Sequence, residues 1–88
     1  MPAMVYGCPY VTINDFAVPD GKVMILTNYS NDAYENPLLS LGFTPAHVQE
    51  IGRSDGIQKE ISAIIQGEEM ILQTVLEPLT SRCIIVKS

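Results

Sequence analysis

The Pro-Asp-Gly tripeptide at residues 19–21 constrains the fold of this chain more than any other feature of its sequence. Proline presets φ at the second position of a turn, and glycine accepts a left-handed φ after the aspartate. Apolar and polar side chains alternate over residues 4–16 before this turn, and residues 22–27 after it form a largely apolar run. We therefore expect a β-hairpin over residues 4–28. Its first strand should lie at a sheet edge or bulge at Pro9, which lacks a backbone donor.

The middle of the chain carries signals that commonly begin and end helices. Asn-Pro at residues 36–37 and Thr-Pro at residues 44–45 each place a capping residue before a proline that suits the first helical position. A glycine follows each of these stretches, at positions 42 and 52, where a helix commonly ends. We expect short helices over residues 38–41 and residues 45–51.

A third helix is expected next, with Ser54 or Asp55 as its cap and Gly67 at its end. The isoleucines at positions 57, 61, 64 and 65 have the spacing of one helical face. The letters G-R-S-D-G at residues 52–56 match the nucleophile elbow of hydrolases, but that elbow needs a preceding strand, a following helix and a large sheet. A connector between two helices explains the same letters, so we predict that Ser54 is a cap and not a nucleophile.

The C-terminal part of the chain is expected to return to strands. Residues 69–76 fit a strand or one face of a helix, and their β-branched content favours the strand. Residues 83–86 form a second apolar strand. The predicted fold class is therefore α+β, in which the N-terminal hairpin and the C-terminal strands form a small antiparallel sheet with two or three short helices packed on one face. We expect one domain over residues 1–88.

The charge pattern disfavours several classes of function. The charged share of residues is 17%, below the usual value of about 25%, and the net charge is −5. The five cations are scattered, which disfavours direct binding to nucleic acid. No apolar run approaches the ~18 residues of a membrane span, and no basic segment followed by an apolar stretch marks a signal peptide. We expect a cytoplasmic protein with no membrane contact.

The low charge stands beside an ordinary hydrophobic share of 47%, which leaves two interpretations open. The first is a well-filled core under a neutral polar surface, and the second is an apolar face that a second copy or a partner covers. Residues 23–26 and 83–86 would place apolar side chains on both faces of their strands, and one layer of helices covers one face. This argument predicts a homodimer or a larger homo-oligomer.

The cysteines and the single histidine do not indicate a reactive centre. Cys8 and Cys83 are expected to be two buried thiols, which would lie close together if the first and last strands are neighbours. His47 and the cysteines lack the close spacing of a zinc site. We therefore predict no catalytic residue, no metal and no cofactor.

Residues 28–36, with the sequence N-Y-S-N-D-A-Y-E-N, form the most loop-like stretch of the chain. Tyrosine offers contact area at a small entropic cost, and asparagine and aspartate supply adaptable hydrogen bonds. In the alternative interpretation, the two tyrosines pack under the loop against the sheet. The candidate partner-binding residues are Tyr29, Asn31, Asp32, Tyr34 and Glu35.

The hypothesis that best fits these features is a small acidic, non-enzymatic protein-binding module, such as a regulator, an inhibitor or an accessory subunit, that acts as a homo-oligomer. Its expected partner is a protein of unknown identity. Two alternatives stay open at this point. One is a ligand-binding protein or an enzyme whose pocket forms between subunits, and the other is a small structural or assembly protein such as a virion or scaffold component.

Overall fold

The computed structural model describes residues 3–88, and every regular element among them is a β-strand. In this part of the chain, eleven strands form three antiparallel sheets. The predicted α+β class, with helices packed on one face of the sheet, is therefore wrong, and the chain is all-β over the described residues.

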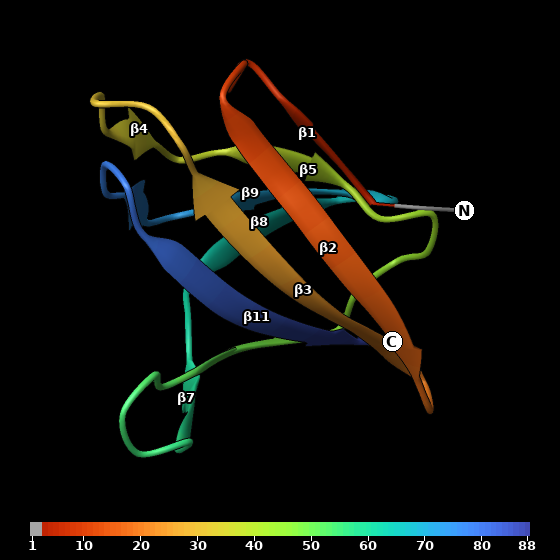
Figure 1. The fold of residues 1–88 in the computed structure, drawn as a ribbon. Coiled ribbons are helices and arrows are strands. Elements are labelled where there is room, and N and C mark those ends of the chain that lie inside the picture. The colour runs from red at the N-terminus through yellow and green to blue at the C-terminus, as the bar shows by residue number, and fades with distance from the viewer. Residues whose placement is uncertain (1–2) are drawn as a thin grey trace.

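Two sheets face each other (Figure 1). The five-stranded sheet consists, in spatial order, of β2 (Val11–Val18), β3 (Gly21–Asn28), β11 (Ser81–Lys87), β6 (His47–Ile51) and β7 (Gln58–Glu60). The four-stranded sheet consists of β1 (Met4–Tyr6), β5 (Leu38–Ser40), β9 (Glu69–Leu72) and β8 (Ala63–Gln66). A small third sheet pairs β10 (Val75–Leu76) with β4 (Tyr34–Glu35).

The predicted turn at residues 19–21 is confirmed, although its strained residue is a different one. Val18 pairs with Gly21, so Pro19 and Asp20 form the two-residue loop of the β2–β3 hairpin. Asp20, and not Gly21, has the left-handed φ of 67°. Gly21 serves another purpose, because a Cβ at this position would lie 1.9 Å from the carbonyl oxygen of Val86 on the neighbouring strand. Glycine is required here by the close approach of β11.

The predicted first strand is divided between two sheets. Residues 4–6 pair with β5 in the four-stranded sheet, whereas β2 pairs with β3 in the five-stranded sheet. Pro9 lies in the turn between them, which the bond from the Val11 amide to the Cys8 carbonyl closes at 3.1 Å. Gly7 turns the chain with a φ of 76°. Both β1 and β2 are edge strands, the kind of strand to which proline is confined.

All three predicted helices are replaced by strands and turns. Residues 38–40 pair with β1 and β9, and β6 pairs with β11 and β7. The isoleucines with helical spacing do not form one buried face, since Ile57, Ile64 and Ile65 are 55%, 44% and 40% exposed. β-branched side chains lose rotamer freedom in a helix and fit a strand well. Pairing with strands distant in the sequence therefore outweighs the local helix signals in this region.

A second connection joins the two sheets at the far side of the molecule. The Ile61 amide donates to the Val48 carbonyl of the five-stranded sheet at 3.3 Å. One residue later, the Ser62 carbonyl accepts from the Gln73 amide, beside the four-stranded sheet, at 2.9 Å. The segment between β7 and β8 is thus hydrogen-bonded to both sheets, and it closes this side of the core.

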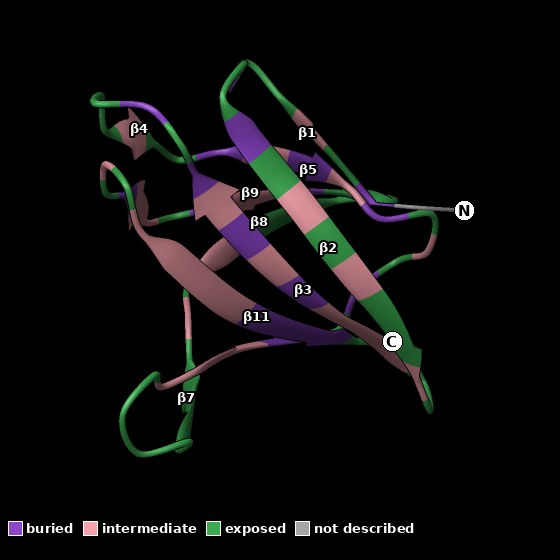
Figure 2. Cartoon of the chain, in the orientation of Figure 1, coloured by how far each residue is buried: buried purple, intermediate pink, exposed green. Residues whose placement is uncertain are grey.

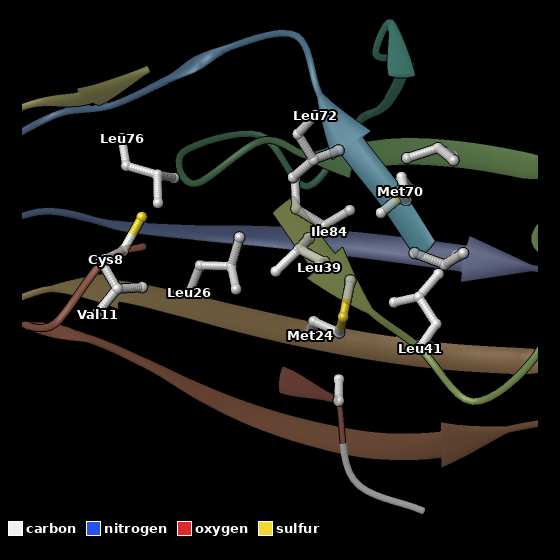
Figure 3. Close-up of a cluster of buried hydrophobic side chains, with 13 residues drawn as sticks. Cys8, Val11, Met24, Leu26, Leu39, Leu41, Met70, Leu72, Leu76 and Ile84 are labelled. Atoms are coloured by element: carbon white, nitrogen blue, oxygen red, sulfur yellow. The ribbon is translucent and has the colours of Figure 1, made fainter. Parts of the chain in front are cut away.

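The core lies between the facing sheets and consists of aliphatic and sulfur-containing side chains (Figure 3). Met24, Leu26 and Ile84 from the five-stranded sheet meet Leu39 and Leu72 from the four-stranded sheet, and each of these side chains is almost fully buried. The interpretation of residues 69–76 as strand is confirmed, since this stretch forms β9 and β10. The predicted strand at residues 83–86 is confirmed within β11.

Candidate functional site

The loop that follows β3 is held by a buried polar side chain. Asn28 is 1% exposed and satisfies its amide completely within the protein. Its Nδ2 donates to the Asp32 carbonyl at 2.8 Å and to the Leu76 carbonyl at 3.1 Å. Its Oδ1 accepts from the Ser30 amide at 2.9 Å and lies 2.8 Å from the Ser30 hydroxyl. Buried networks whose members are all paired hold one conformation, so this loop is preformed.

The same loop places Tyr29 beside Tyr10, which lies in the turn before β2. The Tyr29 amide donates to the Tyr10 carbonyl at 2.9 Å, which joins the loop to the turn before β2. Tyr10 and Tyr29 are 63% and 64% exposed. Between them lies a shallow hollow of about 310 Å³, which we call the tyrosine pocket; its lining residues are Tyr10, Tyr29, Ser30, Asn31 and Asp32.

The tyrosine pocket contains three of the five residues that the sequence indicated. Tyr29, Asn31 and Asp32 line it. Tyr34 packs in part against the core, and Glu35 pairs with β10, so these two are placed in the small third sheet instead. Of the two interpretations of the tyrosines, packing against the core describes the half-buried Tyr34, and exposure describes Tyr29.

Tyr10 is the pocket residue outside the loop, and the sequence did not indicate it. Its position just before β2 gives the one signal that could have found it, because the first and last residues of a hairpin's strands lie opposite each other. Val11 pairs with Asn28, which places Tyr10 opposite Tyr29.

A second hollow lies beside the loop between β6 and β7 and is lined mainly by residues 50–55 and by Lys59. A tight turn forms this loop, in which the Gly56 amide donates to the Gly52 carbonyl at 3.0 Å. Asp55 Oδ1 accepts from the Ile57 amide at 2.9 Å, so the capping side chain is that of Asp55 and not that of Ser54. Both flanking elements are strands, whereas the nucleophile elbow needs a helix after its serine. The predicted helix cap at Ser54 is wrong because no helix follows it.

An ion pair lies directly before this second loop. Arg82 on β11 donates from Nε and Nη2 to the two carboxylate oxygens of Glu50 on β6, at 2.7 and 2.6 Å. Its Nη1 donates to Thr74 Oγ1 at 2.5 Å and to the Val75 carbonyl at 2.7 Å. The hydrogen bonds from Arg82 lower the pKa of Glu50. The bidentate pair joins β11 to β6, and the Nη1 bond to Val75 ties β10 to the five-stranded sheet, so each nitrogen of the guanidinium donates within the protein.

The remaining candidate groups are dispersed. Cys8 is buried in the core, and burial raises the pKa of its thiol. Cys83 lies half-buried on the other face of the five-stranded sheet, with β3 between its strand and β2, so the two thiols are not neighbours. Within residues 3–88, no three His, Cys, Asp or Glu side chains gather into a group that could hold a metal ion.

Comparison with other proteins does not place this chain in a family, because no family model, curated protein or solved structure matches it. Within the described part of the chain, no helix is long and apolar enough to cross a membrane. The chemistry of its lining residues is therefore the basis on which a function for the tyrosine pocket is proposed.

Proposed function

We propose that this protein is a non-enzymatic binding module that recognises a protein partner through the tyrosine pocket. The observation that carries the proposal is that the exposed Tyr29 stands on a loop whose base is fixed by Asn28, and that a backbone hydrogen bond holds this loop beside the exposed Tyr10. An exposed aromatic surface on a preformed loop loses little conformational entropy when it binds, which favours affinity.

The chemistry of the pocket favours a partner segment with a basic side chain. Asp32 supplies a carboxylate, and tyrosine rings attract the cations of arginine and lysine. Among the described residues, none of those that line this pocket is basic. The net charge of −5 would also steer a basic partner toward the protein.

A selection from a random peptide library displayed on phage tests this proposal and does not require the partner to be identified. We expect the selected peptides to be enriched in arginine or lysine. We also expect their affinity to fall at least tenfold for Tyr29→Ala and for Asp32→Asn, measured by isothermal titration calorimetry.

The matched control for this selection is Tyr6→Ala, which removes a tyrosine that is 44% exposed on β1, outside the pocket. It should leave the affinity of the peptides unchanged. Peptides that bind wild type and Tyr29→Ala equally well would show that recognition takes place elsewhere.

A further inference from the structure

The outer face of the five-stranded sheet carries apolar side chains where a solvated sheet would carry polar ones. Strand register places Val23 beside Ile85, and in the next row it places Ile25, Cys83 and Ile51 side by side. The core cluster on the inner face contains Met24, Leu26, Ile84 and Val86 from the same strands, so these outward residues lie outside the core. Antiparallel sheets with one wet face normally alternate between apolar and polar residues.

This surface is defined by the outward side chains of three neighbouring strands and one edge strand, and we call it the outer face. Its apolar members are Phe16, Val23, Ile25, Ile51, Cys83 and Ile85. Phe16 on β2 is 56% exposed, Ile85 is 9% exposed, and the other members on β3, β11 and β6 are half-buried. Figure 2 shows exposed and less exposed residues alternating along β2, which marks the side of this edge strand that faces outward.

Charged groups lie around the outer face and not in its centre. Side chains next to the apolar members are neutral, such as Asn14 beside Ile25 and Gln49 beside Ile85. Glu60, on the edge strand β7, is paired with Gln49 and shares its side of the sheet. Lys87 lies at the end of β11. Over the described strands, the centre of the outer face thus carries no charged side chain.

We propose that the outer face binds a second copy of this chain, so that two five-stranded sheets pack face to face in a homodimer. The charge distribution favours a second copy as the occupant. Two molecules of net charge −5 repel each other, and an uncharged surface is where they can approach at least electrostatic cost. A basic partner would instead be expected to meet acidic side chains.

The size of the outer face also suits a dimer. With strands about 4.8 Å apart and a rise of about 3.3 Å per residue, the five strands cover on the order of 500 Å². Two copies would then bury on the order of 1,000 Å² in total, which is the size at which specific interfaces begin. Two sheets packed face to face lie about 10 Å apart and bury their outward side chains in the same way as a sandwich core.

The position of β11 gives the proposal a geometric consequence. β11 is the third of five strands, so a two-fold axis along it places β11 over its own copy and β3 over β6. Cys83 then lies opposite Cys83 of the partner subunit. The sheets would be about 10 Å apart, too far for a disulfide, which needs Cα atoms within about 7 Å. Both Cys83 thiols would then be covered by the interface.

Sedimentation velocity at micromolar concentration provides the first test. Wild type should sediment with about twice the monomer mass of 9.7 kDa. Ile25→Lys places a charge in the centre of the outer face and should weaken association at least tenfold. The matched control is Ile64→Lys on β8, which changes an isoleucine that is 44% exposed in the other sheet and should leave the dimer intact. A wild-type monomer, or a dimer that dissociates with Ile64→Lys and not with Ile25→Lys, would overturn the proposal.

Thiol accessibility keeps the proposal testable if Ile25→Lys does not fold. In Cys8→Ser, where Cys83 is the remaining thiol, the dimer should shield Cys83 from a monofunctional maleimide. The rate of labelling should rise at least tenfold when dilution dissociates the dimer. A labelling rate that is the same in the dimer and the monomer would contradict an interface over β11.

Discussion

The loops at residues 28–36 and residues 52–56 both stand out in the sequence, but their attachment to the protein differs. The first is anchored by Asn28, a buried neutral side chain that bonds to backbone groups up to 48 residues away. The second is a tight turn with an exposed cap at Asp55, and the side chain that anchors the preceding strand is a charged one, Glu50. The difference between the loops lies in their construction, which residue types alone do not reveal. The first loop has a buried neutral side chain at its base that fixes its arrangement, and the second has an exposed cap.

The largest effect is expected at the base of the first loop. Asn28→Ala leaves the Ser30 amide and the Leu76 carbonyl without their partner in a buried position. Unpaired buried groups cost about 1–3 kcal/mol each, so the free energy of unfolding should fall by about 2–4 kcal/mol. Urea denaturation measures this change. The control is Asn31→Ala in the exposed part of the same loop, which should change stability by less than about 0.5 kcal/mol. Equal effects of the two substitutions would show that Asn28 does not anchor the loop.

A smaller effect, which depends on pH, is expected at the base of the second loop. Because Arg82 lowers the pKa of Glu50 below its ordinary value of 4.5, the ionised carboxylate stabilises the fold above this pH. The stabilisation is lost as the pH falls through the lowered pKa. Glu50→Gln should lower the free energy of unfolding by about 1–2 kcal/mol at pH 7 and by almost nothing once Glu50 is protonated in the wild type.

Urea denaturation between pH 7 and pH 3 checks this prediction. Asp15, whose pKa is lowered by a hydrogen bond from the Ala3 amide and by Lys22, should keep part of the acid sensitivity in the variant. Asn28→Ala, in contrast, should cost the same at every pH at which the protein is folded. A cost of Glu50→Gln that does not change with pH would show that the ion pair does not contribute as described.

The smallest effects are expected within the second loop itself. Asp55→Ala removes one exposed hydrogen bond to the Ile57 amide and should cost about 0.5–1 kcal/mol. Ser54→Ala should change the free energy of unfolding by less than about 0.5 kcal/mol. Thermal unfolding followed by circular dichroism ranks the two variants. A larger cost for Ser54→Ala would restore this serine as the cap of the loop.

The parts of the fold that sequence reasoning predicted are those that local chemistry determines. Pro19 and Asp20 form the hairpin loop because proline presets φ at the first loop position and aspartate tolerates the left-handed φ at the second. The helix signals between residues 36 and 67 are equally local, yet they are overruled by pairing with β11, β1 and β9. Prolines and glycines that commonly bound helices also bound short strands, and one isolated sequence does not distinguish the two cases.

The candidate site was predictable in its composition and not in its construction. The polar and aromatic character of residues 28–36 indicated a loop and left open whether its tyrosines are exposed or packed, and Tyr29, Asn31 and Asp32 do line one pocket. The role of Asn28 depends on Leu76, which the sequence places 48 residues away. The hairpin register places Tyr10 in the pocket, opposite Tyr29. Both contacts result from the fold, so the residues of the loop alone do not reveal them.

Amide hydrogen exchange of the free protein tests most directly the claim that the first loop is preformed. The Ser30 amide donates to a buried acceptor on Asn28, whereas Arg53 and Ser54 lie in an exposed turn. We predict that Ser30 exchanges at least a hundredfold more slowly than Arg53 and Ser54 after correction for intrinsic rates. Exchange of Ser30 as fast as that of the exposed turn would contradict a fixed base and, with it, a preformed tyrosine pocket.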